Sequence, residues 1–337
     1  MNKKTKEIIF TASAFLLLAL TFTASLLLGS QKLTPAQLAE AFTNSKSLSH
    51  TIIFSLRLPR TILALSAGAL LSASGAAFQM YFRNSLAEPG IMGISSGATL
   101  GAVSAQAIGV SGILFGTLSP INVFAFAGAI FAGIIIILIS QKQNGIGGGI
   151  TLLLCGTALA TFYAAVTSII LMTKIRQVNG LYYWVLGSFN GRGWTEVRFV
   201  IAPALISLTL LLFCSNKLDL LSGGERTAQA LGLETKRLRT TILISASLAV
   251  SAAVCAGGTI NFVGLIAPHI VRHFIGTKGK SLISVSMIFG AILLIISDTI
   301  ARTAIAPAEL PTGIITSLLG APFFVSLIFP AQKKGIR

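Results

Sequence analysis

The chain has 337 residues, of which 54% are hydrophobic and only 10% are charged, and its mean hydropathy is +0.86. A soluble globular domain carries about 25% charged residues, so this composition excludes a fold whose whole surface faces water. The formal net charge is +16. The basic residues lie in short segments between apolar runs, where membrane topology and anionic lipids explain them, so no nucleic-acid partner is expected.

Long apolar runs recur along the whole chain, and a membrane-spanning helix needs about 20 residues. Eight such runs and two shorter segments rich in small residues bring the predicted number of spans to ten. In chain order the predicted spans are Ile8–Leu28, Thr61–Tyr81, Ile91–Ile108, Ile121–Ser140, Ile150–Met172, Val200–Phe213, Thr240–Ala256, Thr259–His273, Leu282–Ile296 and Gly313–Phe329. We therefore expect an all-α polytopic membrane protein with one transmembrane domain over residues 1–337.

The first run follows three lysines, as a signal peptide would, but its apolar core is too long and no clean cleavage site follows. We interpret it as a retained span. With both termini in the cytoplasm, 16 of the 25 Lys and Arg residues lie inside, as the positive-inside rule requires. Six basic residues gather outside and need a separate explanation: Arg57, Arg60, Lys174, Arg176, Arg192 and Arg198.

The segment Leu33–Ser47, which follows the first span, is predicted to form a short helix on the outer surface. Thr34 is a suitable N-cap and Pro35 suits the first helical position. We expect this helix to be an ordinary connector.

A weak internal repeat is visible in the sequence. Arg57–Leu63 and Arg237–Leu243 each open a span rich in small residues, and each span is followed by a segment broken by Gly and Pro. The predicted topology has the first copy entering from outside and the second from inside, which is the arrangement of an inverted repeat around a substrate path. The copies cover about residues 57–172 and 237–330. Chance and shared span composition remain the alternative.

The second broken segment, Gly258–Arg272, is the most informative part of the chain. It is apolar, it contains Gly and Pro, and it carries His269 and Arg272 near its end. Each backbone N–H or C=O group that lacks a hydrogen-bond partner in hydrocarbon costs several kcal/mol. The segment must therefore be packed inside the protein or lie beside a water-filled path.

The longest hydrophilic segment on the inner side is Ser215–Arg239, which fits two short helices separated by turns. It is either a solvated loop or a docking surface for a cytoplasmic partner.

The sequence offers no energy source for transport. Gly276–Ser281 has two residues between its glycines where a phosphate loop needs four. The three histidines are dispersed and have no acidic ligand beside them, so neither a metal site nor a cofactor is expected. Asp298 is the candidate for an acid embedded in the membrane that could couple transport to an ion, but Arg302 at i+4 can form a local ion pair with it. We expect a non-catalytic transport subunit with a separate ATPase.

Several stretches, taken together, resemble the permease subunits of the iron-siderophore, haem and cobalamin ABC importers, which are FecCD-type, cobalamin-permease-like type II importers. They run in the family order across nearly the whole chain: Arg57–Arg60, Gly75–Gln79, Arg83–Ala98, Trp184–Ser188, Gly257–Arg272, Glu309–Gly313 and Gly320–Phe323.

This resemblance implies a homodimer of ten-span subunits in the bacterial cytoplasmic (inner) membrane, with a central path and both termini in the cytoplasm. It also implies two ABC ATPase subunits below and a substrate-binding protein above. The segment that contacts the ATPase maps to Ser222–Leu233, with these matching residues: Ser222, Gly223, Gly224, Ala228, Leu231, Gly232 and Leu233.

Other site residues also follow from the resemblance. The outer arginines that pair with acidic residues of the binding protein match Arg57, Arg60 and Arg302, and the inner gate matches Asn84 and Leu86. One departure is Ser85, where the family usually has proline, and it predicts a less rigid turn. A second gate falls near the residues Gly147–Thr151.

The substrate is open at this stage. A ferric siderophore is expected first, then haem or cobalamin, and an oxyanion such as molybdate is an alternative. An ion-coupled secondary transporter and an intramembrane enzyme are the competing classes. The second would need a nucleophile–base or metal set, which the sequence lacks.

Overall fold

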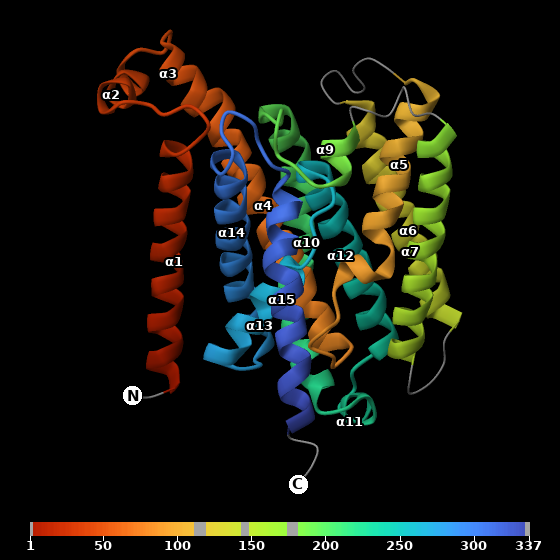
Figure 1. The fold of residues 1–337 in the computed structure, drawn as a ribbon. Helices are drawn as coiled ribbons and strands as arrows, with labels where there is room; N and C mark the ends of the chain where they lie inside the picture. The colour runs from red at the N-terminus through yellow and green to blue at the C-terminus, as the bar shows by residue number, and fades with distance from the viewer. Residues whose placement is uncertain (1–2, 111–118, 143–147, 174–180, 334–337) are drawn as a thin grey trace.

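The computed structural model describes residues 3–110, 119–142, 148–173 and 181–333, which form a bundle of helices without strands (Figure 1). In chain order the helical elements are α1 (Lys3–Leu27), α2 (Pro35–Thr43), α3 (Leu48–His50), the π-helical segment η1 (Thr51–Arg57), α4 (Leu58–Tyr81), the 3-10 turn η2 (Pro89–Met92), α5 (Ile94–Ile108), α6 (Pro120–Lys142), α7 (Gly148–Thr173), α9 (Tyr182–Val185), α10 (Trp194–Ser222), α11 (Glu225–Ala230), α12 (Thr235–Gly257), α13 (Val263–Ile275), α14 (Gly279–Thr303) and α15 (Thr312–Lys333).

The membrane-spanning character of the bundle is confirmed. Among the described residues, seven helical stretches are long and apolar enough to cross a membrane: α1, α3 to α4, α6, α7, α10, α12 and α14. Two further stretches form shorter apolar helices, α13 and residues Thr312–Leu327 of α15. Each of the ten predicted spans overlaps at least one helix, while ten complete crossings remain a prediction.

Helices α4 and α12 form the centre of the bundle. In an apolar 18-residue stretch of the continuous helix Leu48–Tyr81, which contains α4, 83% of the residues are buried, and in one of α12 the share is 78%, whereas in α1 it is 11%. Small residues allow the close packing. A Cβ atom added to Gly68 would lie 2.2 Å from the backbone oxygen of Gly290 in α14, and one added to Gly75 would lie 2.0 Å from that of Gly264 in α13.

The two ends of the bundle differ in what they carry. α11 lies at the end where α1 begins and α15 ends, and α2 and α3 lie at the opposite end (Figure 1). We call these the α11 end and the α2 end. The predicted short helix after the first span is confirmed as α2, and its position on the outer surface remains a prediction. The Thr34 hydroxyl accepts from the Gln37 N–H and the Gln37 side chain accepts from the Thr34 N–H, as in an N-terminal cap.

In both broken segments a short non-α stretch precedes the α-helix. α5 starts only after η2, and α13 starts after irregular backbone in which Gly258 and Phe262 have φ of +71° and +69°. α4 runs towards the α11 end and α12 runs away from it (Figure 1), which is the relation that the predicted inverted repeat requires. The extension of that repeat over residues 57–172 and 237–330 remains a prediction.

One predicted local structure is wrong. The residues of Ser215–Arg239 form one short helix, α11, between the extended ends of α10 and α12, and not two short helices. Cys214, Leu218 and Leu221 are buried at a spacing of four and three residues. This apolar stripe continues α10 past its purely hydrophobic part.

Candidate functional site

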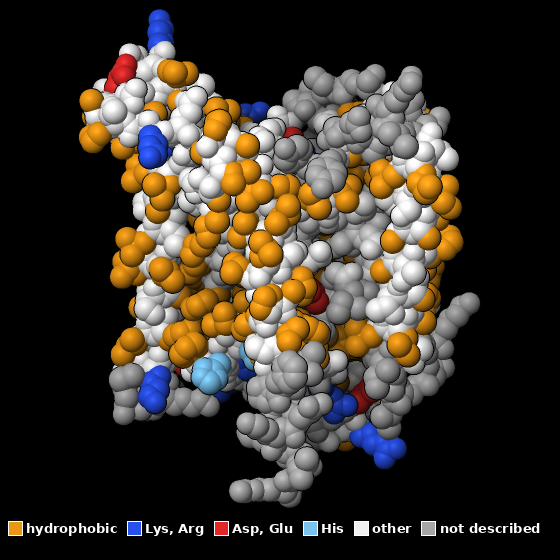
Figure 2. All heavy atoms as spheres, viewed as in Figure 1, with side chains coloured by type: hydrophobic (Ala, Val, Ile, Leu, Met, Phe, Trp, Pro, Cys, Tyr) orange, Lys and Arg blue, Asp and Glu red, His pale blue; other side chains and the backbone are white. Residues whose placement is uncertain are grey.

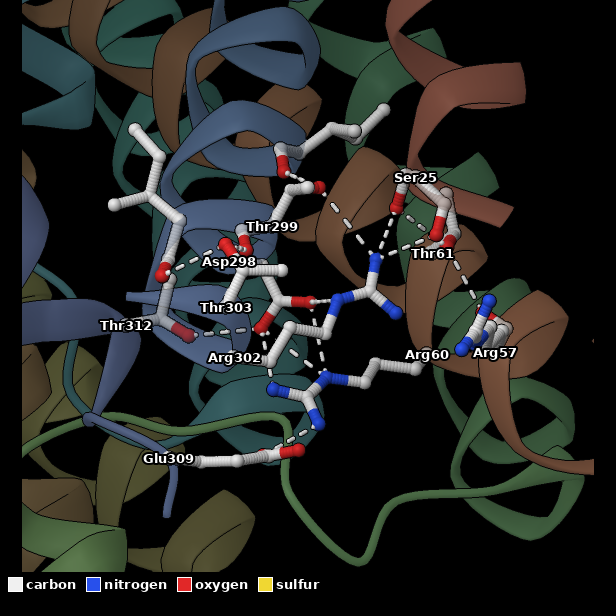
Figure 3. Close-up of polar contacts among 12 residues, drawn as sticks. Ser25, Arg57, Arg60, Thr61, Asp298, Thr299, Arg302, Thr303, Glu309 and Thr312 are labelled. Carbon is white, nitrogen blue, oxygen red and sulfur yellow. Dashed lines mark hydrogen bonds and ion pairs between the residues drawn. The ribbon is translucent and has the colours of Figure 1, made fainter. Parts of the chain in front are cut away.

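A buried ion-pair cluster joins α4 to α14 near the α2 end (Figure 3). The Arg60 guanidinium donates to the Asp298 carboxylate from Nε and Nη2 at 2.9 Å and from Nη1 to Glu309 at 2.8 Å. The predicted local pair between Asp298 and Arg302 is confirmed at 3.6 Å. The Thr312 hydroxyl donates a further hydrogen bond of 3.0 Å to Asp298. Asp298 therefore has its nearest charged partner on another helix.

The two other arginines that are predicted to lie outside hydrogen-bond to α1. Arg57 Nη1 donates to the carbonyl oxygens of Leu26 and Leu27 at 2.9 and 2.8 Å, at the C-terminal end of α1. Arg302 Nη2 donates to the carbonyl oxygen of Ser25 at 2.8 Å (Figure 3). Arg57 and Arg302 are 5% and 2% exposed. Cations near a helix C-terminus are favourable because of the helix dipole, so both have structural partners within the chain.

The three arginines nevertheless line one cavity. It has a volume of about 530 Å³, it lies at the α2 end, and its lining includes Arg57, Arg60, Arg192, Arg302 and Glu309. With Asp298 and Glu196 as the further ion-pair partners of these residues, four guanidinium groups face three carboxylates. The cavity is therefore a region of net positive charge.

Arg192 is held in this cavity by its own network. Its guanidinium donates to the side-chain oxygen of Asn122 at 2.8 Å and lies 3.9 Å from Glu196. Burial lowers the pKa of the Arg192 guanidinium, and the Glu196 carboxylate acts in the opposite direction. Arg198 is exposed. The other members of the predicted outer basic cluster lie outside the described residues: Lys174 and Arg176.

Two cavities lie beside α15 at the place where the broken segments meet. Their volumes are about 520 and 390 Å³, and Asn261 lines both. The first has Thr259 and Ser317 in its lining, and the second has Glu88. The Glu88 carboxylate accepts a hydrogen bond from the backbone N–H of Phe262. The face with α15 in front shows an acidic side chain about midway between the two ends, with hydrophobic side chains around it (Figure 2).

The segment predicted to contact an ATPase lies at the α11 end. Leu231 is 66% exposed, whereas Ala228 is 0% exposed and packs into the protein. The other predicted residues of the segment are exposed or half-buried: Ser222, Gly223, Gly224, Gly232 and Leu233. Leu231 is thus a large apolar side chain of this segment that lies mostly exposed on the surface.

The predicted inner-gate turn directly follows α4 at the same end. The Asn84 side-chain oxygen accepts from the Leu86 N–H at 2.9 Å, and the Asn84 N–H donates to the Gln79 carbonyl oxygen at 3.1 Å. The first contact is an Asx turn, which closes the turn without a proline at Ser85. The second predicted gate falls at the start of α7, and Gly147 lies outside the described residues.

Comparison with known proteins identifies the family of this chain. The sequence matches the model of the FecCD transport family over residues 17–329. The chain belongs to the FecCD transport family. It is 38% identical to the Fe(3+)-citrate import system permease protein YfmE of Bacillus subtilis, over 87% of this chain and 87% of that one. It is also 38% identical to the cobalamin import system permease protein BtuC of Halobacterium salinarum, over 86% of this chain and 76% of that one.

A solved structure supports the same assignment. An inward-facing ABC transporter of metal-chelate type matches this chain with a TM-score of 0.84 and 31% identity, covering 95% of this chain and 99% of that one. The resemblance noted in the sequence is therefore confirmed. This FecCD protein is a multi-pass permease subunit of a metal-chelate type ABC importer.

Sequence reasoning missed three polar residues of this FecCD permease. The sequence predicts no role for Glu88, which lies in the first broken segment, or for Asn261, which lies in the second. Arg239 was counted only as an inside charge, yet it is 6% exposed. A charged residue inside or directly beside an apolar span was the available signal for Glu88 and Arg239.

Proposed function

We propose that this FecCD permease forms, as a homodimer, the translocation path for a metal chelate that a substrate-binding protein delivers. A ferric siderophore is the first substrate class, and haem or cobalamin is the next. The family match over residues 17–329 carries the proposal. The relatives that support it are named for import of Fe(3+)-citrate, iron(3+)-hydroxamate and cobalamin.

The two cavities beside α15 are proposed as part of the path. Their described lining has hydroxyl and amide groups from Thr259, Ser317 and Asn261, one carboxylate from Glu88, and no Lys or Arg. A small oxyanion such as molybdate would meet no cation there. The lining therefore favours a bulky chelate over an oxyanion.

The α2 end is proposed as the outer face, on which the binding protein docks. Arg57, Arg60 and Arg302 lie in a cavity with net positive charge, which attracts acidic side chains. Arg57 and Arg302 already hydrogen-bond to α1. Their contribution to docking is therefore proposed to come mainly from the field of the cluster, which raises the association rate.

The α11 end is proposed as the cytoplasmic face of a bacterial inner membrane, with both termini on this side. Two ABC ATPase subunits would contact the segment Ser222–Leu233, and the turn of Asn84 and Leu86 would act as the inner gate. The exposed side chain of Leu231 supports this contact, since an apolar side chain at the tip of a loop suits a partner's groove.

The test is transport by the complete importer in proteoliposomes. The permease, its ATPase and its binding protein are reconstituted, and uptake of a radiolabelled ferric siderophore is measured with ATP, without ATP, and with an ionophore. We expect uptake that requires ATP and the binding protein and that resists the ionophore. Uptake that needs no ATP and collapses with the ionophore would establish a secondary transporter instead. Labelled cobalamin and molybdate in the same assay distinguish the substrate classes.

A further inference from the structure

Arg239 connects four helices at the α11 end. It belongs to α12, close to the start of that helix, and its side chain is 7% exposed. Its Nε donates to the Tyr81 hydroxyl of α4 at 2.7 Å, and Nη1 donates to the Ser140 carbonyl oxygen of α6 at 3.0 Å. Nη2 lies 3.9 Å from the Glu225 carboxylate of α11. One planar group with five N–H donors thus joins α12 to three other helices.

The partners of Arg239 sit at particular places in the chain. Tyr81 is the last residue of α4, and the turn that contains Asn84 begins directly after it. Glu225 is the first residue of α11, within the segment proposed to contact the ATPase. The guanidinium group therefore lies between the proposed ATPase contact and the proposed inner gate.

A buried guanidinium group restrains its partners more strongly than an exposed one. Removing one partner of a buried charge leaves an uncompensated group at a cost of several kcal/mol, whereas exposed pairs are weak. A displacement of α11 therefore either moves Arg239 and the end of α4 together or breaks these contacts.

We propose that Arg239 is a positioning residue for transport, which couples displacement of α11 to the gate turn after α4. The inference rests on the proposed role of α11 as the ATPase contact. Two contacts of Arg239 carry this coupling. A displacement of α11 acts on Arg239 through Glu225, and Arg239 acts on the turn through the Tyr81 hydroxyl.

The experiment compares variants of the complete importer in proteoliposomes. Arg239→Gln removes the charge and most donors, and Tyr81→Phe removes one acceptor while it keeps the ring. Arg237→Gln is the matched control, because Arg237 is an arginine of the same helix whose side chain is 83% exposed. The measured quantities are chelate uptake per ATP hydrolysed, binding of the ATPase, and the melting temperature of the complex.

We expect Arg239→Gln to lower uptake per ATP by about tenfold, within the range of measured coupling energies, while the ATPase stays bound. Tyr81→Phe should change the ratio in the same direction, and the double variant should lose little more than Arg239→Gln alone. Arg239→Lys, which keeps the charge but not the fork of donors, should fall between wild type and Arg239→Gln. Arg237→Gln should behave as wild type.

Two outcomes would overturn the inference. One is an unchanged ratio in a folded Arg239→Gln complex. The other is a lower melting temperature and weaker ATPase binding in Arg239→Gln together with a wild-type ratio in Tyr81→Phe, since Arg239 would then be structural only. If Arg239→Gln does not fold, the ratio of Tyr81→Phe decides. Failure of the proposed function looks different: cross-links from Leu231→Cys would not reach the ATPase, or the wild type would show no ATP-dependent uptake.

Discussion

Replacing Asp298 with asparagine tests whether the buried ion pairs stabilise the packing of α4 against α14. The Asp298 side chain is 1% exposed, and its carboxylate lies 2.9 Å from Arg60 and 3.6 Å from Arg302. Asparagine keeps the shape but removes the negative charge. Arg60 then keeps Glu309 as its carboxylate partner, whereas Arg302 loses the carboxylate with which it forms an ion pair. Removing one partner of a buried pair costs about 3–5 kcal/mol. We expect the free energy of unfolding to fall by this amount.

The measurement is unfolding of the purified permease by SDS titration in detergent micelles, followed by the fluorescence of its two tryptophans. Glu234→Gln is the matched control, because Glu234 and Arg237 form an ion pair of 2.7 Å whose side chains are 62% and 83% exposed. Exposed pairs contribute about 0.2–1 kcal/mol. If Asp298→Asn is no less stable than Glu234→Gln, the buried cluster does not hold the helices together and the reasoning is refuted.

Two further predictions follow from close contacts. Gly75→Ala should lower the free energy of unfolding by at least about 1–3 kcal/mol, because the added Cβ would lie 2.0 Å from a backbone oxygen of α13. A Cβ at Gly193 would have nothing within 4 Å, so Gly193→Ala should cost less in the same titration, namely the weaker preference of alanine for the N-cap of α10. Glu309→Gln leaves Arg60 with more uncompensated charge at the outer cavity. It should tighten binding of the binding protein at low salt by about 1.5- to 5-fold, as 0.2–1 kcal/mol implies. Glu40→Gln on the exposed face of α2 serves as the control, and equal affinities for the two variants would contradict the prediction.

The helices were predictable because hydropathy and small-residue content are local properties of the sequence. Apolar runs identified the membrane helices, and the Thr34 and Pro35 pattern identified the start of α2. The prediction failed at Ser215–Arg239, where α10 continues because Leu218 and Leu221 are buried against other helices. Burial of an amphipathic end depends on neighbours that are distant in the sequence, and polarity alone therefore predicted two short helices separated by turns.

The candidate site was predictable in its residues but not in its contacts. The sequence offered Arg302 at i+4 as the partner of Asp298, whereas the bidentate partner is Arg60, 238 residues away in the chain. The family pattern singled out Arg57, and the structure places its guanidinium on the C-terminal carbonyl groups of α1. Spacing along a helix reveals neighbours at three or four residues, but a pair between two helices depends on how those helices pack.

The packing of α4 explains why a displacement at Tyr81 would act on the gate turn. Gly75 meets the backbone of α13 and Arg60 is tied to Asp298 of α14, so α4 cannot slide without breaking both contacts. The turn after α4 is held by local hydrogen bonds, among them the Asx contact from Leu86 to Asn84 and the bond from the Asn84 N–H to Gln79. Arg83 in this turn has a φ of +49°, which is unfavourable for a residue with a side chain. A displacement of Tyr81 would therefore act on the turn that directly follows it, which is the predicted gate.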